Sequence, residues 1–113
     1  MKDFKICIIG LGNVGLDLAI NFSRKFNTIG FDIDKKLIRK IKKEESKNLN
    51  FSKKKKTGLK VSYNHKFIAD CDVYIITVPS PVNKKKLPVL DSIVKVTKLI
   101  SKYLKKGNIV IYE

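Results

Sequence analysis

Short runs of apolar residues alternate along the chain with longer stretches that have a helical repeat. Three nearly unbroken apolar runs occupy Ile6–Ile9, Thr28–Phe31 and Asp72–Val78. All three are interpreted as strands, and the third is typical of a parallel strand covered on both faces. After the first run, apolar side chains recur every four residues, which predicts one buried helical stripe. Its members are Val14, Leu18, Phe22 and Phe26, with Ala19 beside them.

The same alternation continues through the middle of the chain. A helix is expected from about Lys35 to Glu45, with Asp34 as its N-cap because it directly precedes the helical pattern. The polar segment Lys47–Gly58 has no periodicity and is interpreted as a solvated loop. A short strand is then predicted at Leu59–Tyr63, followed by a turn or single helical turn at Phe67–Ala69.

The last third of the chain adds one more helix and one more strand. Pro79 ends the third apolar run. A helix is expected to begin after Asp91, as its N-cap, and to end at Gly107, in the C-cap position. Asn108–Tyr112 reads as a final strand. Alternating strands and helices predict an α/β fold, a Rossmann-like doubly wound parallel sheet, as one domain over residues 1–113.

A glycine motif follows the first apolar run directly. It has the form G-x-G-x-x-G, with Gly10, Gly12 and Gly15 in the glycine positions. In a strand–turn–helix context the first glycine permits the tight turn, the second lets the backbone approach a pyrophosphate, and the third lets the helix pack closely on the sheet. The free N–H groups of the helix start then face the phosphates. Asn13 and Val14, in the same loop, are included among the expected cofactor-binding residues.

An acidic residue, Asp32, ends the second apolar run, 22 residues after Gly10. A carboxylate in this place accepts hydrogen bonds from the adenosine ribose and repels a 2′-phosphate, which favours NAD over NADP. The alternative is that the glycines form only a tight turn and that Asp32 caps the helix near Lys35. Because Thr77–Pro81 also follows a strand, three segments are expected to converge on one crevice at the carboxyl ends of the strands.

The chain is strongly basic, with 25 Lys and Arg against 10 Asp and Glu and a formal net charge of +15. Such a charge is compatible with nucleic-acid binding. However, the cations are almost all lysine, with arginine only at Arg24 and Arg39, and they are spread along the whole chain. Since specific recognition favours the planar arginine fork, no specific nucleic-acid partner is expected.

Few other residues in the sequence indicate a redox, metal-binding or membrane function. Cys7 and Cys71 are scattered in apolar surroundings, and are expected to be buried, reduced thiols of a cytoplasmic protein. His65 is the one histidine and has no partner motif, so it is interpreted as a surface or turn residue. No metal-ligand spacing is present, and no apolar run suggests a membrane partner.

Four segments together resemble the N-terminal, NAD-binding domain of the UDP-glucose/GDP-mannose dehydrogenase family. They read KICIIGLGNVGLDLA at residues 5–19, IGFDIDKK at 29–36, CDVYIITVPSP at 71–81 and KKGNIVIYE at 105–113. They occur in the family's order and span nearly the whole chain. The nearest branch is that of the UDP-N-acetylhexosamine 6-dehydrogenases of surface-polysaccharide synthesis.

The resemblance implies a cofactor site. NAD is held by the glycine loop and by the acid matching Asp32. The loop Val78–Pro81, at the end of the third apolar run, lines the same site. The expected cofactor-binding residues here are Thr77, Val78, Pro79 and Ser80. Asn13 and Asp17 replace a tyrosine and a proline of the family pattern. Two alternatives stay open for Asp17: its charge weakens NAD affinity, or its side chain points to solvent.

The resemblance also implies an oxidoreductase that converts the C6 alcohol of a UDP-sugar to a carboxylate with NAD. The family continues beyond Glu113 into the part that carries its catalytic cysteine. We therefore expect the sheet to be incomplete at its C-terminus and the isolated chain to be inactive, and we assign no catalytic residue to it. Two alternatives stay open at this point. One is a stand-alone NAD-binding or regulatory module, or a subunit that associates with a separate C-terminal catalytic chain. The other is a basic nucleic-acid-binding protein.

Overall fold

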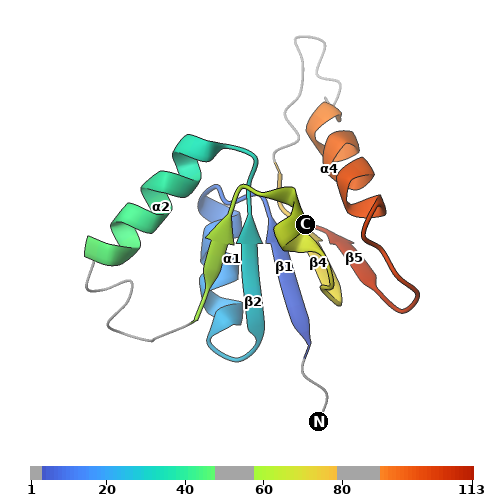
Figure 1. Ribbon diagram of the computed structural model, residues 1–113, viewed down its shortest axis with the longest axis horizontal. Coiled ribbons are helices and arrows are strands. Elements are labelled where there is room, and N and C mark those ends of the chain that lie inside the picture. The colour runs from blue at the N-terminus through green and yellow to red at the C-terminus, as the bar shows by residue number, and fades with distance from the viewer. Residues whose placement is uncertain (1–3, 48–57, 79–89) are drawn as a thin grey trace.

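The computed structural model describes residues 4–47, 58–78 and 90–113, and its centre is a five-stranded parallel sheet (Figure 1). The strand order is β3-β2-β1-β4-β5, so β1 lies in the middle and the chain reverses its direction of winding between β1 and β4. The strands are β1 (Lys5–Ile9), β2 (Asn27–Phe31), β3 (Lys60–Ser62), β4 (Val73–Ile76) and β5 (Ile109–Tyr112). This confirms the predicted doubly wound α/β fold.

Helices cover both faces of the sheet and produce two separate hydrophobic clusters. The helical elements are α1 (Asn13–Ser23), α2 (Lys35–Lys47), the 3₁₀ turn η1 (His65–Ile68) and α4 (Asp91–Ser101). Ala19 of α1 and Ile38 of α2 pack with Ile8 and Ile75 on one face. On the other face, Val96 of α4 joins a cluster with Cys7, Ile9 and Tyr74. Figure 1 shows α2 beside the β3 edge and α4 along the β5 side.

The predicted apolar stripe of α1 is wrong at its two ends. Val14 is exposed, with 63% of its surface accessible, and Phe26 is an exposed residue beyond the end of the helix. The buried positions are instead the small residues Gly15, Ala19 and Ser23, which also recur every four residues. Leu18 and Phe22 are only partly buried beside this stripe. The helix lies so close to the sheet that small side chains occupy the contact, and larger ones are placed on its flanks.

The predicted start of α2 agrees with the structure, but the predicted start and end of α4 do not. Asp34 is the N-cap of α2 as predicted, because its Oδ1 accepts the N–H groups of Lys36 at 3.0 Å and Leu37 at 3.1 Å. Asp91 is not a cap, since it is the first residue of α4 and its acid lies in the first turn. Gly107 is not a helix C-cap either. The helix ends at Ser101, and Gly107, with a φ of +93°, belongs to the turn before β5.

The two cysteines are free and buried in the α4-side cluster, as expected. Burial raises the pKa of the Cys7 thiol well above its ordinary value, so this thiol stays protonated. Burial also raises the pKa of Tyr74 to about 12, and its hydroxyl donates to the Ile68 carbonyl at 2.7 Å. His65 lies at the surface in η1, where its Nδ1 contacts the Tyr103 hydroxyl at 2.7 Å. No helix within the described ranges is long and apolar enough to span a membrane.

Candidate nucleotide-binding crevice

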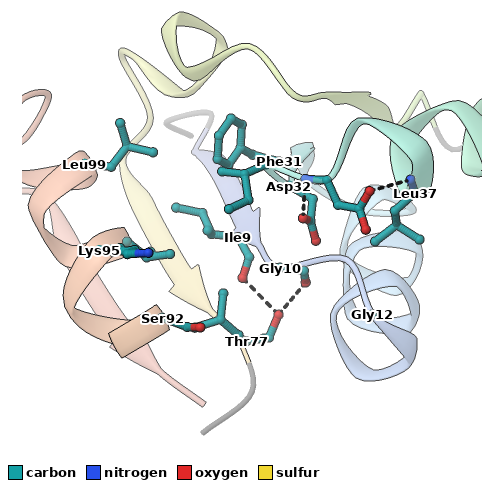
Figure 2. Close-up of a pocket in the computed structure, with 14 residues that line it drawn as sticks. Ile9, Gly10, Gly12, Phe31, Asp32, Leu37, Thr77, Ser92, Lys95 and Leu99 are labelled. Carbon is teal, nitrogen blue, oxygen red and sulfur yellow. Dashed lines mark hydrogen bonds between the residues drawn. The ribbon is translucent and has the colours of Figure 1, made fainter. Parts of the chain in front are cut away.

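A cavity of about 360 Å³ opens at the carboxyl ends of the central strands, between the glycine loop and α4 (Figure 2). It lies where the winding direction of the sheet reverses, which is the usual ligand position in open α/β sheets. The segments expected to converge do so within the described part of the chain. The lining residues are Ile9, Gly10, Gly12, Phe31, Asp32, Ile33, Asp34, Leu37, Thr77, Val78, Ser92, Lys95, Val96 and Leu99.

The glycine loop leaves β1 through a backbone conformation that only glycine adopts easily. Gly10 has a φ of +97°, and its N–H donates to the Phe31 carbonyl at 2.9 Å. Gly12 then precedes α1 without a side-chain cap, and a Cβ added there would meet no atom within 4 Å. The first turn of α1 carries no acid. Its N–H groups and its positive dipole end therefore suit a phosphate that approaches over Gly12.

Gly15 has a structural task in the same motif. A Cβ at this position would lie 1.7 Å from the Gly10 carbonyl oxygen and 2.5 Å from the Thr77 hydroxyl oxygen. Any side chain would therefore separate α1 from the loop and from the end of β4. Gly15 does not line the cavity but sets how closely the helix approaches it.

Asp32 faces the glycine loop from the end of β2. Its Oδ2 accepts the Leu11 N–H at 2.8 Å, and its Oδ1 accepts the Asp34 N–H at 2.9 Å. Each carboxylate oxygen keeps a further lone pair, and the residue lines the cavity. Asp34, and not Asp32, caps α2 through its own Oδ1. The alternative in which Asp32 serves only as a helix cap is therefore contradicted by the geometry.

The other expected site residues divide into three groups. Thr77 and Val78 line the cavity from the end of β4. Asn13 and Val14 lie in the first turn of α1 with exposed side chains and do not line it. Pro79 and Ser80 lie outside the described residues, so their expected contacts stay predictions. Asp17 is an exposed residue of α1 and is not part of the lining, which agrees with the alternative that its side chain points to solvent.

One wall of the crevice was missed by the sequence analysis. Four residues of α4 line the cavity at helical spacing: Ser92, Lys95, Val96 and Leu99. Figure 2 shows Ser92, Lys95 and Leu99 opposite Asp32 and Leu37. The i, i+3, i+4, i+7 spacing of these four residues is present in the sequence. A helix that follows β4 in this topology begins beside the crevice, and this signal could have identified the wall. In the described part of the chain, no three acidic, cysteine or histidine side chains form a metal-binding group.

Comparison with known proteins shows which family the chain resembles. Residues 4–113 match the model of the UDP-glucose/GDP-mannose dehydrogenase family, NAD binding domain. The chain is 40% identical to a UDP-N-acetyl-D-glucosamine 6-dehydrogenase of Pseudomonas aeruginosa, over 100% of this chain and 28% of that protein. It is 39% identical to the enzyme of the same name from Salmonella typhi, over 100% of this chain and 27% of that protein.

Solved structures agree with this placement. The structure of UDP-D-ManNAc dehydrogenase from Pyrococcus horikoshii has a TM-score of 0.85 and 25% identity, over 97% of this chain and 28% of that chain. The chain therefore spans a little over a quarter of the length of the relatives that it matches.

Proposed function

The chain belongs to the UDP-glucose/GDP-mannose dehydrogenase family, and we propose that residues 1–113 form a single domain that binds NAD in the crevice described above. The family's domain is an NAD-binding domain. We further propose that the domain serves a nucleotide-sugar 6-dehydrogenase that oxidises a CH–OH group of a UDP-sugar with NAD, in polysaccharide synthesis in the cytoplasm. The similarity to UDP-N-acetyl-D-glucosamine 6-dehydrogenases supports this substrate class.

The observation that carries the proposal is the pairing of Asp32 with the glycine loop across the crevice. A pyrophosphate over Gly12 would accept N–H groups from the first turn of α1, at Asn13 and Val14, and would meet no side chain there. The adenosine ribose would then lie against Asp32, whose carboxylate can accept its hydroxyl protons. The loop Thr77–Ser80 would contact the remainder of the cofactor.

We assign cofactor binding and no catalytic step to this chain. The lining of the cavity, as far as the structure describes it, contains no cysteine or histidine. Cys7 and Cys71 are buried in the core and are not among the lining residues. A bound nicotinamide would supply a hydride acceptor, but the described lining residues include no thiol or imidazole to act on the sugar. Steady NADH formation from NAD and a UDP-hexose by the purified chain would contradict this assignment.

Titration of the purified chain with NAD and NADP, by calorimetry, tests the proposal. We expect NAD to bind more tightly, because Asp32 would meet a 2′-phosphate as an unpaired like charge. Asp32→Asn should weaken NAD about tenfold or more and reduce the preference over NADP, since a hydrogen bond to a charged group is lost. Asp17→Asn is the matched control, because it removes an exposed acid of α1 outside the cavity lining and should preserve the preference. Tighter binding of NADP than of NAD would reject the proposal.

A further inference from the structure

Thr77 lines the crevice, but its hydroxyl is engaged with the glycine loop. The hydroxyl oxygen lies 2.6 Å from the Gly10 carbonyl oxygen and 3.1 Å from the Ile9 carbonyl oxygen, and it donates to this pair. The backbone N–H of Thr77 also donates to the Ile9 carbonyl, at 2.8 Å. Figure 2 shows both contacts of the hydroxyl, which join the end of β4 to the loop after β1.

The Gly10 carbonyl and the Leu11 N–H belong to one peptide group. The carbonyl accepts the Thr77 hydroxyl at 2.6 Å, and the N–H donates to Asp32 Oδ2 at 2.8 Å. Because a peptide group is planar, holding its oxygen also fixes the direction of its N–H. The rigid peptide between Gly10 and Leu11 therefore connects Thr77, which follows β4, with Asp32, which follows β2.

We infer that Thr77 is a positioning residue for nucleotide specificity, because it orients the Leu11 N–H that holds the Asp32 carboxylate. The inference rests on the proposed function, since it takes Asp32 to be the group that meets the adenosine ribose. Without the hydroxyl, the oxygen of the peptide between Gly10 and Leu11 loses the hydrogen bond that helps to hold its direction. The carboxylate of Asp32 then keeps the Asp34 N–H but loses a fixed second partner. A less firmly oriented carboxylate discriminates less between a ribose hydroxyl and a 2′-phosphate.

The test compares two substitutions at one position. Thr77→Val removes the hydroxyl and keeps the shape, whereas Thr77→Ser keeps the hydroxyl. We expect the valine variant to lower the ratio of NAD to NADP affinity about fivefold, the effect of one hydrogen bond. The serine variant should stay within about twofold of the wild type, on the same scale. Thr28→Val is the matched control, because its buried hydroxyl donates to the Phe26 carbonyl at 3.1 Å near the opposite end of β2.

A double-mutant cycle separates positioning from general loosening of the fold. In an Asp32→Asn background, Thr77→Val should change the affinity ratio little further, because the residue through which it acts has lost its charge. Equal effects of the valine substitution in both backgrounds, or equal behaviour of the valine and serine variants, would overturn the inference. If Thr77→Val does not fold, Thr77→Ala removes the same hydroxyl with less bulk and carries the same expectations.

Amide hydrogen exchange in the nucleotide-free chain gives a second measurement. The Leu11 amide should exchange about tenfold faster in Thr77→Val than in the wild type or in Thr77→Ser, because its hydrogen bond opens more often. Unchanged Leu11 exchange would overturn the inference, whatever the chain binds. A wild-type chain that binds neither nucleotide would instead reject the proposed function, and the exchange measurement would still decide whether Thr77 orients this peptide.

Discussion

The two halves of the sheet differ in how completely they are covered. On the face that carries α1 and α2, parallel pairing places Ile8 of β1, Ile75 of β4 and Ile111 of β5 in one row. Their exposed fractions are 0%, 6% and 43%. The adjacent row shows the same trend, because Ile109 of β5 is also exposed and Val73 beside it is partly buried.

Both halves contribute to the crevice, but in different ways. The half made up of β1, β2 and β3 supplies the glycine loop and Asp32, and the helices α1 and α2 cover one of its faces. The half made up of β4 and β5 supplies Thr77 and the α4 wall, and its last strand has an open face. The groups proposed to bind phosphate and ribose thus lie on the well-packed side. Changes at β5 should therefore be separable from changes in nucleotide binding.

The largest effect is expected from adding one methyl group to the packed half. Gly15→Ala should lower the free energy of unfolding by about 3 kcal/mol or more, because the new Cβ would overlap the Gly10 carbonyl and force α1 away from the loop. Gly12→Ala is the matched substitution, since its Cβ meets no atom within 4 Å. It should leave stability within about 0.5 kcal/mol and weaken NAD binding by blocking the approach of the phosphates. Urea unfolding and NAD titration of both variants check this contrast.

A pair of substitutions in one row measures the difference between the halves directly. Ile75→Thr should lower the free energy of unfolding by about 2 kcal/mol, since it places a hydroxyl in a buried position. Ile111→Thr should cost about 0.5 kcal/mol or less, because the side chain is already partly in water. Neither side chain lines the crevice, so NAD affinity per folded molecule should be unchanged. Equal costs in unfolding experiments on dilute protein would show that the β5 face is covered in solution.

The smallest effect concerns an ion pair in the open half. Lys105 pairs with Asp70, which has a φ of 64° in the turn before β4, and both side chains are largely exposed. The hydrogen bond from Lys105, and then its charge, lower the pKa of Asp70 below its ordinary value. A lowered carboxyl pKa contributes stability that is present above the ordinary pKa and is lost as the pH falls through the lowered one.

Lys105→Met should therefore lower the melting temperature by about 2 °C or less at pH 7, because exposed ion pairs contribute little. The difference from the wild type should disappear once the pH is low enough to protonate Asp70 in the folded chain. Lys102→Met, at the end of α4, is the control for loss of one positive charge. Thermal unfolding followed by circular dichroism between pH 2 and 7 measures the difference. A difference between the two variants that persists at the acid end would contradict this account.

The sequence by itself determined the features that depend on neighbouring residues. Each strand or helix, the glycine turn at Gly10 and the Asp34 cap depend on residues that lie within a few positions of the feature itself. Asp32 was placed by its distance from the motif along a strand–helix–strand unit of nearly constant length. These features followed from local backbone chemistry, and the fold class followed from their alternation.

Tertiary structure alone decided which of two possible stripes of α1 is buried and which helix closes the crevice. A helix of 3.6 residues per turn places Val14 and Gly15 on different sides, and hydrophobicity favoured the stripe that begins at Val14. The close approach of α1 to the Gly10 carbonyl selected the small residues instead. The link from Thr77 through one peptide to Asp32 joins three strands that are distant in sequence, and no local pattern records such a contact because pairing across the sheet creates it.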